Sequence, residues 1–155
     1  GFRSVEVEST SNRFAVSVNG TAIFCRGACW TTNDFFSLRD NPASLRRTLE
    51  LMRDAGANII RIGGTMIYES DLFHTLCDEL GIMVWQDFMF ANMDYPIDDP
   101  DFRHDVREEI SETIDRLLQH PSTTMFCGNS EATEARGIRH SLRTVITMFR
   151  RPSLS

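Results

Sequence analysis

The chain of 155 residues contains no lysine, so all 16 of its basic residues are arginine. It has no apolar run near the roughly 20 residues that a membrane span needs, and no basic and apolar leader opens it. The net charge of −6 gives no general reason to expect a nucleic-acid partner. These absences argue against membrane and nucleic-acid functions and slightly favour a cytoplasmic location.

Metal-binding patterns are also missing. The cysteines show no C-x-x-C pair and no histidine at zinc-like spacing. Cys25 and Cys29 are four positions apart, which is only a weak metal or redox signal. We therefore predict no metal and no cofactor. The four histidines, which we expect to be surface or structural residues without partners, are His74, His104, His120 and His140.

The opening of the chain alternates as β-strands do. Apolar residues occupy every second position over 5–7 and 14–18, and Asn19–Gly20 is a strong two-residue hairpin turn. Strand-like sequence then continues over 21–28. We predict a β-hairpin that leads into a first parallel strand.

Helices and short apolar strands alternate through the rest of the chain. Asn41–Pro42, Ser70 and Asp99–Pro100 are helix start signals. The helices are expected over 42–55, 71–80 and 100–119. The strands are expected to begin near residues 24, 58, 82 and 124.

This alternation implies parallel strands joined by crossovers, so the predicted fold class is α/β. An open doubly wound sheet and part of a (β/α)8 barrel fit the pattern equally well. No glycine-rich nucleotide loop follows any strand. A complete barrel needs about 250 residues, so at most half of one is present.

Residues 135–155 differ in composition from the rest. They contain no acidic residue, although arginines recur through them. Apolar residues at 138, 142, 145–146 and 149 fit a fourth helix. An origin outside the parent reading frame fits equally well, so 135–155 is assigned as a tail of uncertain origin within a single domain over 1–155.

One carboxylate stands at the end of the last predicted strand. Met125–Cys127 is a short apolar run that ends in Gly128–Ser130 and then Glu131. Functional side chains of parallel barrels gather at the carboxyl ends of the strands. Glu131 is therefore a candidate general acid, and the alternative is a helix N-terminal glutamate favoured by the helix dipole.

Four strand-end motifs together resemble glycoside hydrolase family 2, and in particular its β-mannosidase branch. The motifs, in chain order, are F-C-R-G-A-C-W, I-I-R-I-G-G-T-M-I-Y-E-S-D, L-C-D-E-L-G-I-M-V-W-Q-D-F-M-F-A and F-C-G-N-S-E. The resemblance covers residues 2–134. It implies a partial (β/α)8 TIM barrel of about the first four βα units, preceded by a β-hairpin. The other barrel half and the β-sandwich domains of the parent protein are missing.

The resemblance also implies roles for individual residues. The family is retaining, with two carboxylates about 5 Å apart. Glu131 matches its acid/base, whereas the nucleophile belongs to a later strand beyond this chain. Arg61 resembles the arginine that holds the nucleophile, and Asp87 resembles a residue facing the sugar. Residues expected to face the barrel interior are Ile60, Ile62, Val84 and Phe126.

Further substrate contacts come from loops. Trp30 and Asp34 resemble the first-strand loop that contacts sugar hydroxyls, although Trp30 could equally be a core residue. Ser130 stands where the family usually has the asparagine that binds the sugar 2-hydroxyl, with Asn129 one position earlier. Gly63 and Cys29 also depart from the family pattern, which usually has tryptophan and asparagine there.

The leading interpretation is a fragment of a retaining exo-β-glycosidase that hydrolyses terminal β-mannosides. It would carry the acid/base but lack the nucleophile, so the isolated chain should be inactive. Its expected partner is a carbohydrate. The alternative is a non-catalytic half barrel that binds a sugar or a protein.

Overall fold

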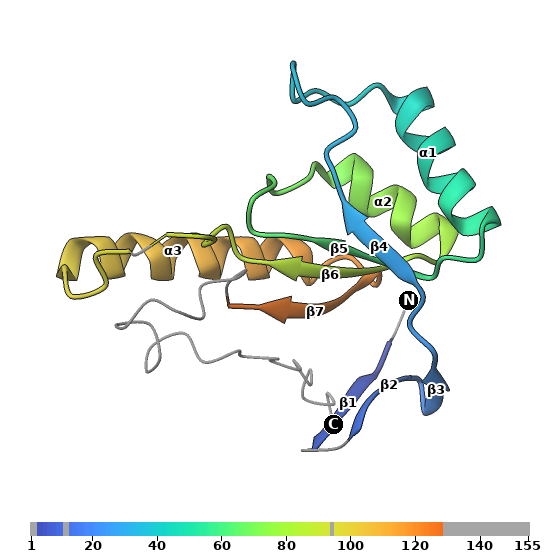
Figure 1. The fold of residues 1–155 in the computed structure, drawn as a ribbon, viewed down its shortest axis with the longest axis horizontal. Helices are drawn as coiled ribbons and strands as arrows, with labels where there is room; N and C mark the ends of the chain where they lie inside the picture. Colours follow the sequence, from blue (N-terminus) through green and yellow to red (C-terminus); the bar gives the residue numbers. More distant parts are fainter. Residues whose placement is uncertain (1–2, 11–12, 94, 129–155) are drawn as a thin grey trace.

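The computed structural model describes residues 3–10, 13–93 and 95–128, which form two sheets and three helices (Figure 1). The antiparallel sheet has the order β1–β2–β3 and the parallel sheet the order β4–β5–β6–β7. The predicted α/β class is confirmed. The strands are β1 (Val5–Thr10), β2 (Arg13–Val18), β3 (Thr21–Ile23), β4 (Gly27–Trp30), β5 (Ile59–Ile62), β6 (Met83–Asp87) and β7 (Thr123–Cys127). The helices are α1 (Pro42–Asp54), α2 (Asp71–Leu80) and α3 (Pro100–Leu117).

The predicted helix starts are confirmed by capping contacts. The Asn41 side chain accepts a hydrogen bond from the backbone N–H of Ser44 at the start of α1, and Ser70 accepts one from Phe73 in α2. Asp99 accepts from two N–H groups in the first turn of α3. Each side chain satisfies donors that the helix leaves unpaired. Helix α3 ends at Leu117, slightly before its predicted end.

The predicted strand over 21–28 is wrong as a single element. Strand β3 ends at Ile23 in the antiparallel sheet, and β4 begins at Gly27 in the parallel sheet. The side chain of Asn58 holds the connection, because it accepts from the Arg26 N–H at 2.8 Å and donates to the Phe24 carbonyl at 2.9 Å. Asn58 makes these two hydrogen bonds to residues that lie 32 and 34 positions earlier in the chain. A long-range contact therefore divides a run that resembles a single strand in the sequence.

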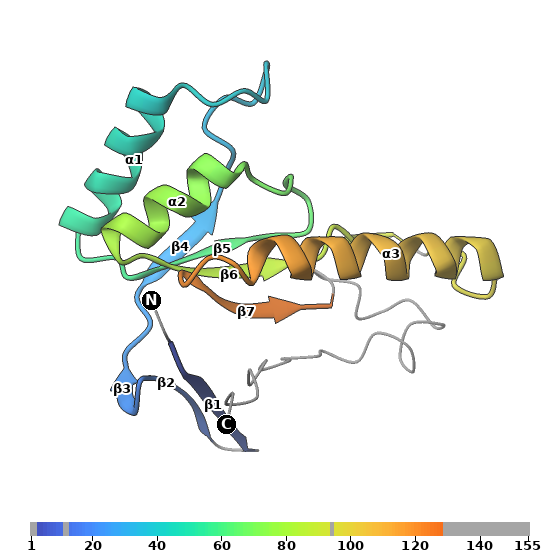
Figure 2. The ribbon, with the colours of Figure 1, turned by 180° about the vertical axis from the view of Figure 1, so that it is seen from behind.

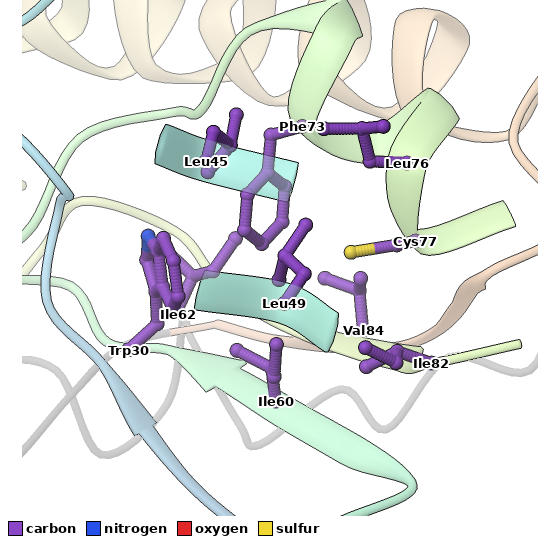
Figure 3. Close-up of a cluster of buried hydrophobic side chains, with 10 residues drawn as sticks. All are labelled: Trp30, Leu45, Leu49, Ile60, Ile62, Phe73, Leu76, Cys77, Ile82 and Val84. Atoms are coloured by element: carbon purple, nitrogen blue, oxygen red, sulfur yellow. The ribbon is translucent and has the colours of Figure 1, made fainter. Parts of the chain in front are cut away.

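Helices cover one face of the parallel sheet (Figures 1 and 2). Figure 3 shows the side chains of α1 and α2 packed on those of β5 and β6. This core contains Trp30, Leu45, Leu49, Ile60, Ile62, Phe73, Leu76, Cys77, Ile82 and Val84. A second cluster packs Phe126 with Leu117 and the apolar side of α3.

The expected orientation of the strands is therefore wrong. Ile60, Ile62, Val84 and Phe126 face the helices instead of the sheet's other face. Successive side chains of a strand point to opposite faces, so a shift of one residue reverses the whole assignment. The other face of β5 is left to Ile59 and Arg61.

The antiparallel sheet packs on this second face at the amino ends of the parallel strands (Figures 1 and 2). Val16 clusters there with Ile59 and Met125. Gly27 is required beside them, because a Cβ atom at this position would lie 1.7 Å from the carbonyl oxygen of Ile59. The carboxyl half of the same face carries the predicted site residues Arg61 and Asp87.

Two histidines depart from expectation, because each has a carboxylate partner. Nε2 of His104 lies 3.3 Å from Oε1 of Glu108 on the same helix. Nδ1 of His120 lies 2.8 Å from Oδ2 of Asp78. Oδ1 of Asp78 accepts a hydrogen bond from the backbone N–H of Ser122 at 2.7 Å. Asp78 therefore ties the end of α2 to the turn that precedes β7, 42 and 44 positions later in the chain.

The buried side chain of His74 leads us to expect that the stability of the fold depends on pH. It is fully buried on α2 with its ring centroid 5.2 Å from that of His120. The pKa of His74 is lowered to about 4, mainly by burial and also by His120 and Arg116, while Asp78 and Asp71 oppose the shift. Below the unfolded pKa of about 6.5 the unfolded chain binds more protons. The free energy of unfolding should therefore fall from pH 6.5 towards pH 4, by up to about 1.4 kcal/mol per pH unit.

Urea denaturation between pH 7 and pH 4.5 measures this slope. The variant His74→Leu should lose most of the slope above pH 5, where few carboxylates titrate. An equal slope in the wild-type chain and in the variant would contradict the assignment to His74.

Candidate active site

An ion pair lies at the carboxyl end of the parallel sheet, on the face away from the helices. Nη2 of Arg61 in β5 donates to Oδ2 of Asp87 in β6 over 2.7 Å, and Nε lies 3.2 Å from the same oxygen. The Asp87 side chain is 0% exposed and that of Arg61 is 35% exposed. The hydrogen bond to Asp87 raises the pKa of Arg61, although burial opposes it. The pair joins a fully buried carboxylate to a cation that is partly exposed.

Trp85 supports the cation from the neighbouring strand. It pairs with Arg61 in the register of β5 and β6, and the guanidinium carbon lies 5.2 Å from the centroid of the Trp85 ring. A cation near an aromatic face is attracted by the ring's quadrupole. Cys29 of β4 pairs with Arg61 on the other side and is exposed. Asp87 and Trp85 together fix the guanidinium.

The predicted acid/base follows the strand that ends beside Asp87. Cys127, the last residue of β7, pairs with Asp87, and its carbonyl accepts from the N–H of Phe88 at 2.9 Å. Asn129, Ser130 and Glu131 come directly after Gly128 in the sequence but lie outside the described residues. Their assigned roles stay predictions. The structure places the end of β7, which precedes these three residues in the sequence, beside Asp87.

Trp30 is a core residue in the structure, which was the alternative to its predicted contact with sugar hydroxyls. It is 5% exposed, and its ring centroid lies 5.0 Å from that of Phe73 (Figure 3). Its Nε1 donates to Oε1 of Glu69 over 2.8 Å. Trp30 therefore packs beneath the loops on the helix side of the sheet, apart from the open face that carries Arg61.

Asp34 lies in the loop between β4 and α1 and organises a turn. Its carboxylate accepts hydrogen bonds from the N–H groups of Phe36 at 2.9 Å and Ser37 at 3.1 Å, and from the Ser37 hydroxyl. These bonds, led by the Ser37 hydroxyl, lower the pKa of Asp34. The loop also exposes the rings of Phe35 and Phe36. The structure does not bring Asp34 into contact with Arg61 or Asp87.

Sequence reasoning missed three residues near these strand ends. Trp85 lies two positions before Asp87 in the same strand, so the two side chains are on one face of the sheet. This spacing could have identified Trp85 as a neighbour of the site. Tyr68 and Glu69 stand within the second motif, but nothing local shows what they bind. Glu69 is only 2% exposed, and its burial raises the pKa of its carboxyl group against the hydrogen bonds from Trp30 and Thr32.

No helix of the described residues is long and apolar enough to cross a bilayer. Within the same residues, no group of three or more His, Cys, Asp or Glu side chains could hold a metal ion.

Comparisons with known proteins found close relatives. The chain is 44% identical over 136 residues to the β-mannosidase of Bos taurus, an alignment that covers 84% of this chain and 15% of that protein. It is 38% identical over 135 residues to the β-mannosidase B of Emericella nidulans, covering 84% of this chain and 16% of that protein. No family model matches the chain.

A solved structure shares both sequence and fold. The β-D-mannosidase of Dictyoglomus thermophilum superposes with a TM-score of 0.77 at 44% identity, covering 83% of this chain and 16% of that chain. The chain is a β-mannosidase-like segment of glycoside hydrolase family 2. It spans only 15% of the length of the Bos taurus relative.

Gly63 and Cys29, the two residues that depart from what the resemblance leads us to expect, lie near the ion pair. Gly63 directly follows β5, and its carbonyl accepts a turn hydrogen bond from the N–H of Met66 at 3.0 Å. Cys29 lies beside Arg61 on the exposed edge strand.

Proposed function

We propose that β4–β7 are the first four strands of a (β/α)8 barrel and carry part of the active site of a retaining exo-β-mannosidase. Glu131 is the acid/base of this site. The nucleophile, the rest of the barrel and the β-sandwich domains belong to a longer protein. The substrate is a terminal β-mannoside, and the reaction needs no metal or cofactor because two carboxylates supply all of its proton transfers and its covalent step.

In the first step, the carboxylate nucleophile attacks the anomeric carbon and the bond to the leaving oxygen breaks. Glu131 transfers its proton to that oxygen. In the second step, Glu131 removes a proton from water, the water oxygen attacks the anomeric carbon, and the nucleophile leaves. Two inversions give overall retention. Glu131 must be protonated at the start, which requires burial or a nearby negative charge to raise its pKa.

Arg61 is suited to orient the missing nucleophile. Its Nε and Nη2 are used by Asp87, whereas Nη1 has no hydrogen bond within the part of the chain that the structure describes. Guanidinium groups carry five N–H donors in a fixed fork, so one edge can bind Asp87 while the other binds a second carboxylate. Asp87 holds the guanidinium in place, and the positive charge of Arg61 balances its negative charge.

The observation that carries this proposal is the placement of the Arg61–Asp87 pair. It lies at the carboxyl end of the sheet, beside the end of β7 that leads to Glu131. Barrel enzymes gather functional groups at this end of the sheet, and among the described residues Nη1 of Arg61 has no hydrogen-bond partner there.

A segment exchange tests the proposal. Residues 2–134 replace the matching segment of the Dictyoglomus thermophilum enzyme, and the chimera is assayed with an aryl β-mannoside. We expect the chimera to hydrolyse it and the isolated chain to show no turnover above a Glu131→Ala control. A folded but inactive chimera would favour the non-catalytic alternative, and turnover by the isolated chain would show that it contains its own nucleophile.

A further inference from the structure

We propose that Tyr68 and Glu69 are positioning residues that hold the end of β4 and the segment after β6 in place on either side of β5, and so fix the Arg61–Asp87 pair. We call these two residues the 68–69 bridge. The inference rests on the proposed function, since it assigns the bridge a role in that reaction.

Glu69 forms the contact towards β4. Its Oε1 accepts the 2.8 Å hydrogen bond from Nε1 of Trp30, the last residue of β4. Trp30 directly follows Cys29, which pairs with Arg61. Both Trp30 and Glu69 are buried, so no water replaces this bond. Removing this hydrogen bond would take away one contact between the end of β4 and the loop after β5.

Tyr68 forms the contact towards β6. Its hydroxyl donates to Oε1 of Glu109 on α3 over 2.6 Å and accepts from the backbone N–H of Met89 at 3.3 Å. Met89 follows Asp87 by two positions, and Phe88 between them donates to the carbonyl of Cys127 at the end of β7. The tyrosine hydroxyl therefore acts on the backbone that carries Asp87 and adjoins the end of β7.

The two contacts point to different sides of the molecule. Tyr68 packs with the cluster of Phe88, Phe126 and α3, whereas the partner of Glu69 is in the cluster of α1 and α2. Two adjacent residues therefore reach the end of β4 on one side and the segment after β6 on the other. Arg116 of α3 fixes the same segment, since its Nη1 donates to the Glu69 carbonyl at 3.0 Å.

Glu69 is buried and Tyr68 is partly buried, which suits a fixed role for both side chains. Burial raises the pKa of Tyr68, so the phenol stays protonated and keeps its donor. Misplacing a catalytic group by about 1 Å can cost about 100-fold in rate. We expect Tyr68→Phe to lower kcat of the chimera about tenfold with little change in KM, because the variant shifts Asp87 without removing a substrate contact.

Tyr95→Phe is the matched control. Tyr95 also lies in the segment after β6 and its hydroxyl accepts from the N–H of Ala91 at 2.9 Å, but this bond stays within the same loop. The control should lose a similar hydrogen bond and keep kcat within twofold. For Glu69, alanine should lower kcat, whereas Glu69→Gln keeps an acceptor for Trp30 and should restore most of it.

Amide hydrogen exchange of the isolated chain provides a second readout. Tyr68→Phe should increase the exchange of the Met89 amide at least tenfold, and Tyr95→Phe should leave it unchanged. Equal kcat values for the Tyr68→Phe and Tyr95→Phe chimeras, or unchanged Met89 exchange, would overturn the inference. An inactive wild-type chimera together with increased Met89 exchange would instead overturn the proposed function and leave the positioning of this loop supported.

Discussion

Replacing Glu131 with alanine in the chimera is expected to lower kcat for a β-mannoside with an unactivated leaving group by about 10²–10⁴-fold, the usual contribution of a positioned general acid. The physical reason is that an alkoxide leaves only if it receives a proton as the bond breaks. A nitrophenolate leaves without that proton, so the first step with an activated substrate should slow much less. The ratio kcat/KM on both substrates measures the difference, because it reports the first step and not the later breakdown of the glycosyl-enzyme.

Glu134→Ala is the control for this prediction. It removes another glutamate from the same segment, but one that the family resemblance does not place at the strand end. Its kinetics should match those of the unmodified chimera on both substrates. If Glu131→Ala lowers kcat/KM equally for both substrates, Glu131 does not act as the acid.

The ion pair should show an asymmetric response to mutation. Arg61→Met leaves the fully buried Asp87 carboxylate without its cation, which should lower the free energy of unfolding by about 3–5 kcal/mol. Asp87→Asn leaves Arg61, whose side chain is 35% exposed and can bind water. The asparagine oxygen also still accepts a hydrogen bond, so we expect a loss of only about 1–2 kcal/mol.

Urea denaturation of the isolated chain measures both variants near pH 7. The double variant Arg61→Met/Asp87→Asn closes the cycle, and it should be more stable than Arg61→Met because the unpaired buried charge is gone. Equal losses for the two single variants would mean that Asp87 is hydrated in solution and that the pair does not fix Arg61.

Local signals were sufficient to predict the helices. The partners of Asn41 and Ser70 are backbone N–H groups three positions ahead in the chain. Such caps depend on almost nothing else in the fold. The Asn19–Gly20 turn was equally local, since Asn19 and Gly20 both have positive φ, of 51° and 77°, as a two-residue hairpin turn requires.

The strand orientation could not be predicted in the same way. Three of the four residues of β5 are isoleucine, and a strand packed on both faces does not alternate between apolar and polar. Arg61 is the one residue there that distinguishes the faces, and it lies on the side away from the helices. The apolar neighbours Ile60 and Ile62 carry no such information by themselves.

Contacts between distant residues account for the rest of what was missed. Trp30 and Glu69 are 39 positions apart, and Tyr68 reaches Glu109 across 41 positions. Which side chains meet depends on the register of β4, β5 and β6, which the sequence alone does not determine. The strand ends that carry Arg61 and Asp87 were predicted because the family motifs mark them, and their pairing follows from that register.

The most direct test of the central claim is azide rescue of the Glu131→Ala chimera with an activated aryl β-mannoside. If Glu131 is the acid/base of a retaining enzyme, the glycosyl-enzyme accumulates because no base activates water, and azide, which needs no base, attacks it. We expect azide to raise the rate and NMR to identify β-mannosyl azide, the product of retained configuration. A rate that does not respond to azide, or a product of α configuration, would contradict the assignment.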